Sequence, residues 1–297
     1  MDDLSSGYLK NIEDLLTNPA FQFIQSDILG YTEWEKIIEP GDVILHLAAT
    51  VGVNKVVVNA LETLENNYRP TLFLLELAGK YHCKVFFSST SEVYGELDSG
   101  PFSESDPLIV PSSLCGRSAY ILGKIISEQY CVEYCRQKGV PVIIARFFNV
   151  VGNNQSSRFG MVVPTFIEQA FNSQPITIYG DGSQSRSFCD IEDLILAVRM
   201  LLNCPPAWGK TFNIGSAEAI TINQLACYIR EQIGSGSRLL HLPFPDNRSR
   251  GLDIRHRAAC IEKIQAFTGW EPRVRWMESV DSIIANRLIE SKTSLQT

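Results

Sequence analysis

Short apolar runs alternate with longer helical segments along most of this chain. The runs are rich in β-branched and aromatic residues and read FQFI (21–24), VILHLA (43–48), KVFF (84–87), VIIARFF (142–148) and TFNI (211–214). The segments with helical spacing cover residues 57–81, 118–138, 162–173 and 191–203. Strands and helices in this alternation form a parallel sheet with helices on both faces. The sequence therefore predicts an α/β fold with a doubly wound parallel sheet.

The pattern loosens from about residue 150 onward. Residues 152–160 are rich in Gly and Asn, and a GDGS turn follows at 180–183. Further helices are predicted at 221–233, 259–268 and 278–290. We therefore predict a sheet domain in residues 1–150, and a smaller, interleaved substrate lobe made mainly by residues 151–297.

The net charge of −7, from 26 basic and 33 acidic residues, argues against a surface for nucleic acid. The apolar runs are too short to cross a bilayer, and the beginning of the chain carries charges where a signal peptide is apolar. A cytoplasmic protein with no membrane partner is predicted. The eight cysteines form no CxxC pair and do not cluster with the four histidines, so we expect reduced thiols and no metal site.

Tyr120 and Lys124 stand four residues apart on a predicted helix, so both side chains lie on one face. An ammonium beside a phenol favours the phenolate, which is a usable general base. The same spacing occurs at Tyr134 and Lys138, so position must decide between the pairs. Ligands bind at the carboxyl edge of a parallel sheet, where helices begin. Tyr120 is the candidate because Tyr134 lies roughly 21 Å further along the helix.

A run of hydroxyl side chains, SSTSEVYG (88–95), directly follows the predicted strand KVFF. Taken by itself, such a run is typical of a helix N-cap or a turn. Beside the Tyr120 and Lys124 pair it has a second interpretation, in which the hydroxyls hydrogen-bond a substrate oxygen and hold it near the base.

Eight short motifs extend through nearly the whole chain: HLAA (46–49), STSEVYG (89–95), YILGK (120–124), RFFNVVG (146–152), RFGMVVPTFIEQA (158–170), ITIYGDGSQSRSF (176–188), TFNIGS (211–216) and GWEP (269–272). In this order they resemble the extended short-chain dehydrogenase/reductase superfamily, in its branch of nucleotide-sugar epimerases, dehydratases and decarboxylases. The resemblance implies a Rossmann-like fold, NAD as the cofactor and a UDP-linked sugar as the substrate.

By this resemblance Thr90, Tyr120 and Lys124 match the catalytic triad, in which Tyr120 removes the proton of the sugar 4-hydroxyl as hydride passes to the cofactor. The resulting 4-keto sugar permits epimerisation, dehydration or decarboxylation. Ser91 and Glu92 bear on this choice, because Thr-Ser-Glu resembles the pattern of UDP-glucuronate decarboxylases. A decarboxylase is therefore implied first, with a UDP-glucose or UDP-glucuronate 4-epimerase and a sugar 4,6-dehydratase as alternatives.

The resemblance also implies two sets of binding residues and a homodimer. The cofactor set is Asp2, Asp27, Ile28, Ala48, Ala49, Asn67, Ser88, Tyr120 and Lys124. The substrate set is Asn149, Arg158, Arg186, Arg255 and Arg257, whose guanidinium groups suit phosphates and carboxylates. His46 is expected to be a packed residue rather than a ligand. The dimer would form through helices 57–81 and 118–138, whose apolar residues include Leu72, Leu74, Leu75, Ile125 and Ile126.

A full member of this superfamily opens with a strand, a glycine-rich phosphate loop and a helix, which this sequence does not contain. MDDLSSG (1–7) resembles the segment after the second strand, where an acidic residue, here Asp2, holds the adenosine ribose. The sheet is expected to lack its first strand, which leaves VILHLA (43–48) with an unpaired edge. Either the chain is truncated at its start or it is a degenerate member. The second case keeps open a catalytically silent module that binds a nucleotide sugar.

Overall fold

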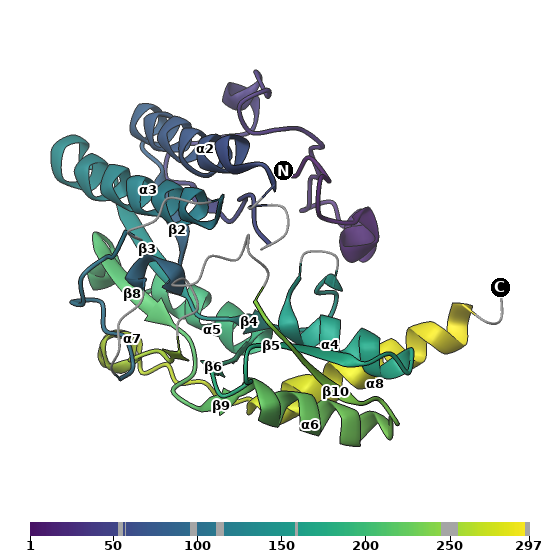
Figure 1. Cartoon of the computed structure of the whole chain (residues 1–297). Helices are drawn as coiled ribbons and strands as arrows, with labels where there is room; N and C mark the ends of the chain where they lie inside the picture. Colours follow the sequence, from purple (N-terminus) through teal and green to yellow (C-terminus); the bar gives the residue numbers. More distant parts are fainter. Residues whose placement is uncertain are drawn as a thin grey trace.

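The computed structural model describes residues 1–52, 56, 58–95, 100–110, 116–157, 160–244 and 255–294 (Figure 1). Within these residues the main sheet has four parallel strands in the order β1–β2–β3–β8. They are β1 (Val43–His46), β2 (Lys84–Thr90), β3 (Val142–Phe147) and β8 (Lys210–Ile214). Because all four run in the same direction, their carboxyl ends meet at one edge of the sheet.

The central strands of this sheet are buried on both faces, which explains their continuous apolar sequences. The helices that cover it are α2 (Ala60–Tyr81) and α3 (Gly116–Lys138) on one face, and α5 (Ile191–Leu202) and α7 (Glu262–Thr268) on the other. Phe87 and Ile144 pack toward α2 and α3, whereas their neighbours Phe86 and Ile143 pack toward α5 and α7. Figure 1 shows α2 and α3 side by side. The predicted doubly wound α/β fold is confirmed.

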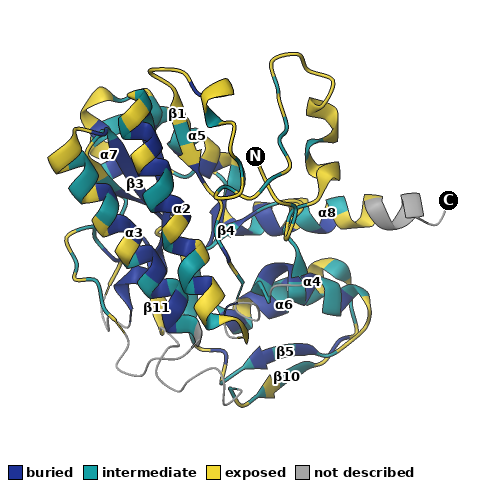
Figure 2. Ribbon diagram, turned by 90° about the horizontal axis from the view of Figure 1, so that it is seen from above, coloured by how far each residue is buried: buried dark blue, intermediate teal, exposed yellow. Residues whose placement is uncertain are grey.

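A second lobe meets the carboxyl ends of the main strands. Its helices are α4 (Val162–Phe171), α6 (Ile222–Ile233) and α8 (Trp276–Ser294), which share an apolar core of their own. Figure 2 shows this core as buried positions on the facing sides of α4, α6 and α8. The strands form three small sheets, β10–β5, β11–β6–β9 and β4–β7. Their bounds are β4 (Val150–Val151), β5 (Ile176–Tyr179), β6 (Ser185–Ser187), β7 (Cys189–Asp190), β9 (Ala219–Thr221), β10 (Leu239–Leu242) and β11 (His256–Arg257).

The two parts are interleaved along the chain. β8, α5 and α7 all follow residue 150, yet β8 pairs with β3, and the two helices cover the main sheet. The domain boundary at residue 150 stays a prediction. Short 3-10 helices complete the described elements: η1 (Leu9–Leu15), η2 (Trp34–Lys36), η3 (Ser91–Tyr94) and η5 (Pro205–Ala207).

The prediction of a strand at 21–24 is wrong. Next to this segment there is a single strand-like bridge, between Asp2 and Gln25. A strand needs a neighbouring backbone over several residues, and one bridge does not supply it. β1 pairs with β2 alone among the described strands, and its Val43 and Leu45 are 41% and 46% exposed. This is the unpaired edge that the sequence predicts.

The apolar residues expected at a dimer face are divided between core and surface. Leu74 and Leu75 on α2 are 3% and 0% exposed, so they belong to the core between α2 and the sheet. Ile126 on α3 is 36% exposed and remains available to a partner. The homodimer stays a prediction.

The described part of the chain has free thiols, and neither a membrane-spanning helix nor a metal-binding group is found among its residues. The seven cysteines described are free thiols. The described helices include none with the length and apolar character that crossing a membrane requires. The described His, Cys, Asp and Glu residues include no group of three or more that could hold a metal ion.

Candidate active site

Thr90 ends β2 at the carboxyl edge of the sheet, and η3 begins with the next residue. Its hydroxyl oxygen accepts a hydrogen bond from the backbone N–H of Glu92 at 3.2 Å, which caps this short helix. The Thr90 side chain is also hydrogen-bonded to the phenol of Tyr120. Thr90 is therefore an N-cap, as its local sequence indicates, and it also lies beside the candidate base.

Tyr120 lies near the start of α3, as predicted. Burial raises the pKa of Tyr120, and the neighbouring carboxylate of Glu92 raises it further. The hydrogen bond with Thr90 and the charges of Arg257 and Arg117 lower this pKa without outweighing the other two effects. The protein surroundings therefore favour the neutral phenol, and a cation bound beside the ring would shift Tyr120 toward phenolate.

Lys124 lies one turn further along α3, and its ammonium reaches β2. Nζ donates a hydrogen bond to the backbone carbonyl of Ser88 at 2.7 Å and lies 4.8 Å from the centre of the Phe87 ring. The residue is 2% exposed. Burial lowers the pKa of Lys124 to about 8, although Cys131 and Glu128 oppose this shift. At neutral pH the side chain therefore places a positive charge at a fixed point close to the end of β2.

The second Tyr/Lys pair, Tyr134 and Lys138, has a different environment. Both residues line a hollow of about 430 Å³ near the end of α3, together with Ile126, Gln129, Tyr130, Glu133 and Gln137. All of these residues belong to α3 itself. Of the two pairs, the one formed by Tyr120 and Lys124 lies at the carboxyl edge of the sheet.

Glu92 on η3 faces arginines from three other elements. Arg117 in the first turn of α3 donates to both carboxylate oxygens, from Nε at 3.2 Å and from Nη2 at 3.0 Å. Arg257 on β11 places Nη1 3.6 Å from Oε1, and Arg186 on β6 adds a further positive charge. Burial alone would raise the pKa of Glu92, but these charges lower it to about 2. We call Arg117, Arg186 and Arg257 the arginine cluster.

Arg117 is the candidate residue that the sequence analysis missed. It lies three residues before Tyr120 on α3, so the two side chains are neighbours on the helix surface. Its spacing from Tyr120 was readable in the sequence. Its contact with Glu92 was not, because that contact depends on how η3 packs against α3.

Two of the predicted substrate residues, Arg186 and Arg257, lie near Glu92, and a third, Asn149, contacts the residue that follows Arg186. β6 and β11 pair in parallel with Arg186 opposite Arg257, which brings both to the arginine cluster. Asn149 follows β3, and its side-chain amide donates to the carbonyl of Ser187, next to Arg186, at 2.8 Å. The second lobe thus supplies positive charge to the edge of the main sheet.

The remaining predicted catalytic and substrate residues have other placements. Ser91 is buried at the start of η3, 1% exposed, between Thr90 and Glu92. Arg255 is exposed, and its charge acts on Asp181. Arg158 lies outside the described residues.

The loop after β1 carries part of the predicted cofactor set. Ala48 is exposed and Ala49 is half-buried, so this loop lies at the surface after β1. Asn67 on α2 is 2% exposed. Its side chain accepts from the N–H of Thr50 at 3.0 Å and donates to the carbonyls of Thr50 and Thr63 at 3.2 and 2.8 Å. The polar groups of Asn67 are therefore used to hold this loop against α2.

Ser88 and His46 connect the ends of β1 and β2. Ser88 Oγ donates to the carbonyl of His46 at 3.0 Å. His46 is a packed residue, as expected: it is 3% exposed, and Nε2 lies 3.0 Å from Thr71 Oγ1. Burial and the charge of Lys124 lower the pKa of His46 to about 3, so the imidazole is neutral at physiological pH.

The remaining cofactor residues lie near the start of the chain. Asp2 is exposed, and the Asp2–Gln25 bridge brings it next to the turn at Asp27. The Asp27 carboxylate accepts from the N–H groups of Leu29 at 2.8 Å and Gly30 at 3.1 Å. Ile28 packs against the core under α2. The structure therefore brings Asp2 and Asp27 to one short surface segment.

Comparison with known proteins bears on the whole of this arrangement. Residues 2–215 match the model of the NAD dependent epimerase/dehydratase family. The chain belongs to this family. As a member of the epimerase/dehydratase family it is an enzyme with NAD as its cofactor, and both of these predictions are confirmed at the level of the family.

Similar proteins of known function include two decarboxylases. UDP-N-acetyl-alpha-D-glucosaminuronate decarboxylase of Bacillus cytotoxicus is 31% identical over 286 residues, which cover 96% of this chain and 88% of that protein. UDP-glucuronic acid decarboxylase 1 of Danio rerio is 31% identical over 284 residues, which cover 96% of this chain and 65% of that protein. The chain thus spans less than two thirds of the Danio rerio relative.

Solved structures of similar fold include two epimerases. UDP-glucuronic acid 4-epimerase from Bacillus cereus, in complex with NAD, has a TM-score of 0.80 and 29% identity, covering 94% of this chain and 85% of that one. UDP-glucose 4-epimerase from Thermotoga maritima, with UDP-glucose, has a TM-score of 0.85 and 26% identity, covering 98% and 90%. The resemblance to nucleotide-sugar enzymes of Rossmann-like fold is confirmed.

We predict that Glu92→Gln lowers the free energy of unfolding at pH 7 by on the order of 1–3 kcal/mol. The folded-state pKa of Glu92 is about 2, against 4.5 for the free side chain. The carboxylate therefore contributes stability above pH 4.5, and this contribution is lost as the pH falls toward 2. Urea unfolding should show a smaller cost of the substitution at about pH 3.5 than at pH 7.

Glu133→Gln is the control, because the ion pair between Glu133 and Arg136 lies on the surface of α3 and contributes little. Its effect should be small at both pH values. A cost of Glu92→Gln that does not change with pH, or that equals the cost of Glu133→Gln, would contradict this electrostatic description.

Proposed function

We propose that this protein is a nucleotide-sugar decarboxylase that oxidises C4 of a UDP-linked uronic acid, with UDP-glucuronate as the first candidate. The arginine cluster carries the proposal. Arg117 and Arg257 act electrostatically on both Glu92 and Tyr120, so these two guanidinium groups lie close to the candidate base as well as to the Glu92 carboxylate. A uronic acid has its carboxylate on C5, next to C4, and guanidinium groups bind carboxylates through paired hydrogen bonds.

The names of the relatives support the same substrate class. Both decarboxylases described above are named for UDP-linked sugar acids. The Bacillus cereus epimerase is named for UDP-glucuronic acid. The sequence Thr90-Ser91-Glu92, with its resemblance to decarboxylases, favours loss of carbon dioxide over epimerisation within this class.

The residues at the carboxyl edge fit the nicotinamide end of NAD. Lys124 has one acceptor, the Ser88 carbonyl, among its described hydrogen bonds, so its ammonium has further N–H groups for ribose hydroxyls. Ala48, which is exposed, and Ala49, which is half-buried, have short side chains that would allow a cofactor to approach the loop closely. Asp2, beside Asp27 and Ile28, would hold the adenosine end. When bound, oxidised NAD supplies a hydride acceptor and a positive charge.

Proton transfer at C4 is then the work of Tyr120. A neighbouring positive charge and the ammonium of Lys124 stabilise the phenolate, which accepts the proton of the 4-hydroxyl as the C4 hydride leaves. Thr90, already hydrogen-bonded to Tyr120, would orient the same sugar oxygen. The product of this step is a 4-ketone.

A ketone at C4 makes the C5 carboxylate a β-keto acid. The bond between C5 and the carboxylate carbon breaks, carbon dioxide leaves, and the electron pair is held as an enolate that takes up a proton at C5. Tyr120 would give its proton back to the C4 oxygen as the ketone is reduced again. The arginine cluster would hold the carboxylate in place before its loss, and Glu92 would keep the three guanidinium groups together.

The alternative is a UDP-glucuronate 4-epimerase. The similarity to the Bacillus cereus epimerase, at 29% identity and a TM-score of 0.80, favours it specifically. Both reactions begin with the same oxidation at C4 and use the same charged substrate. They differ in whether the carboxylate carbon is lost, so their products distinguish them.

We predict that the protein, incubated with NAD and UDP-glucuronate, forms a UDP-sugar lighter by one carbon dioxide. UDP-glucose and UDP-galactose should remain unchanged, because neither offers a carboxylate to the arginine cluster. Liquid chromatography with mass spectrometry separates the products. A C4 epimer of unchanged mass would support the epimerase instead. Binding of UDP-glucuronate with no conversion would support a module that is silent toward this substrate and would overturn the proposed decarboxylase function.

We predict that Tyr120→Phe lowers turnover by roughly 10²–10⁴, the usual contribution of a general acid or base. The substitution removes the ionisable hydroxyl and keeps the ring, so the fold should survive. Tyr134→Phe makes the same change on the same helix and should keep activity within a few-fold of the parent. Both variants are compared at matched thermal stability. Full activity in Tyr120→Phe, or equal losses in the two variants, would show that Tyr120 is not the base.

A further inference from the structure

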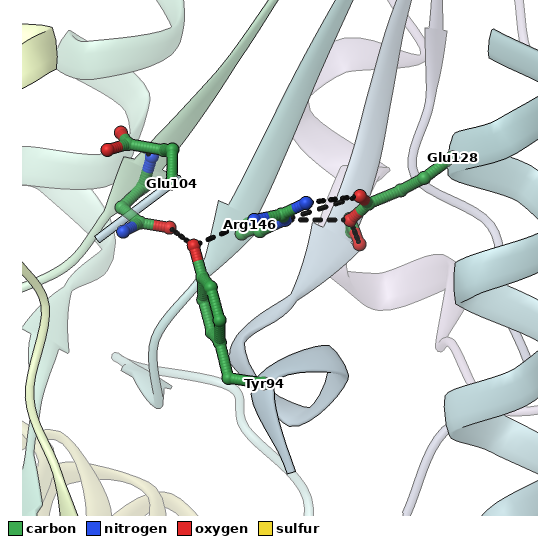
Figure 3. Close-up of polar contacts among 6 residues, drawn as sticks. Tyr94, Glu104, Glu128 and Arg146 are labelled. Atoms are coloured by element: carbon green, nitrogen blue, oxygen red, sulfur yellow. Dashed lines mark hydrogen bonds and ion pairs between the residues drawn. The ribbon is translucent and has the colours of Figure 1, made fainter. Parts of the chain in front are cut away.

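A buried ion pair joins α3 to the main sheet one helical turn beyond Lys124. Arg146 on β3 donates from Nε to Glu128 Oε1 at 3.0 Å and from Nη2 to Oε2 at 2.6 Å (Figure 3). The Arg146 and Glu128 side chains are 7% and 5% exposed. Burial alone would lower the pKa of Arg146, but its hydrogen bonds to Glu128 raise it, so the guanidinium is charged. Buried ion pairs are often no more stabilising than apolar residues of the same volume, so stability alone does not explain this pair.

On one side the pair holds the end of β2. Ser89 Oγ donates to Glu128 Oε1. Ser89 lies between Ser88, whose carbonyl accepts from Lys124, and Thr90, which is bonded to Tyr120. Glu128 therefore fixes the short segment of β2 that the candidate triad uses.

On the other side the pair holds η3. Arg146 Nη1 donates to the hydroxyl of Tyr94 at 2.9 Å, and Tyr94 in turn donates to Asn213 Oδ1 on β8 at 2.6 Å. The backbone N–H of Asn213 donates to Glu104 at 2.7 Å. Figure 3 shows Arg146 between Glu128 and Tyr94. Tyr94 ends the helix that carries Glu92, so the same chain of contacts reaches the arginine cluster.

We infer that Glu128 and Arg146, with Ser89 and Tyr94, form a positioning network that sets the register of α3 against β2 and η3 for catalysis. The inference rests on the proposed function. Apolar contacts between α3 and the sheet have no preferred direction. A bidentate ion pair, in contrast, fixes both the distance and the orientation of the two side chains that it joins. A displacement of about 1 Å in a reacting group is enough to cost roughly 10²-fold in rate.

The first test compares Ser89→Ala with Ser127→Ala. Both serines are buried, and each substitution removes a hydroxyl group that joins α3 to a neighbouring element. Ser127 donates to the carbonyl of Asn67 at 2.8 Å and so joins α3 to α2 rather than to β2. Ser89→Ala should lower kcat for the UDP-uronate about tenfold with KM within about twofold, because positioning acts on the reaction more than on binding. Ser127→Ala should leave both parameters within about twofold, and equal effects of the two substitutions would overturn the inference.

The second test replaces the network by apolar groups, in the triple variant Ser89→Ala, Glu128→Leu, Arg146→Met. Such replacements often preserve stability, so the urea midpoint should stay close to that of the parent. kcat should nevertheless fall by about 10² or more with little change in KM. Retained kcat in the folded triple variant would overturn the inference. If the triple variant does not fold, the two serine variants decide.

A third readout does not depend on the substrate. Hydrogen exchange followed by mass spectrometry should be faster in residues 88–94 of Ser89→Ala than in the parent, and unchanged there in Ser127→Ala. If the parent protein shows no turnover, the proposed function is wrong, and the hydrogen-exchange measurement still tests whether the positioning network exists. Identical exchange in the two variants would overturn the network as well.

Discussion

Burying an ionised side chain is unfavourable unless a partner is in place, and this constraint shapes the carboxyl edge of the sheet. Glu128 forms an ion pair with Arg146, and Glu92 forms ion pairs with Arg117 and Arg257. Each partner comes from a different element: α3 and β3 in the first case, and η3, α3 and β11 in the second. The charges are therefore stable only when the main sheet, α3 and the second lobe are assembled together, which couples the fold to the site.

The same constraint explains the unusual state of the two candidate catalytic side chains. Lys124 is buried with a carbonyl rather than a carboxylate as its nearest hydrogen-bond acceptor, and its pKa falls to about 8. Tyr120 is held as a phenol next to Glu92. A positive charge bound beside these two side chains would therefore change the ionisation of Tyr120 more than that of Lys124. A site of this kind favours proton transfer during hydride chemistry over binding alone.

The sequence predicts well what depends on local pattern. KVFF and VIIARFF are strands that are buried on both faces, as their continuous apolar sequences indicate. Because Tyr120 is near the start of its helix, the sequence also predicts that Tyr120, rather than Tyr134, lies at the carboxyl edge of the sheet. FQFI is similarly apolar and is no strand, because strand formation also needs a partner backbone. The apolar pattern of a segment shows that it favours a strand, but the strand forms only where a neighbouring backbone is in place to pair with it.

The charged contacts could not be predicted, because they join residues that packing brings together. Arg255 and Arg257 are two residues apart in the sequence, yet one is exposed and the other faces Glu92. Residues two apart on one strand would share a face, but β11 comprises only His256–Arg257, so its pairing with β6 fixes Arg257 and leaves Arg255 outside the strand. Arg117 and the Glu128–Arg146 pair were missed for the same reason.

Transfer of hydrogen from C4 of the sugar is the event on which the proposed chemistry depends. The most direct measurement uses UDP-glucuronate with deuterium at C4 and examines the cofactor by mass spectrometry after quenching during turnover. We expect deuterium on the cofactor while the substrate is being consumed, and its return to C4 of the product. Product formation with no label on the cofactor at any time would contradict oxidation at C4.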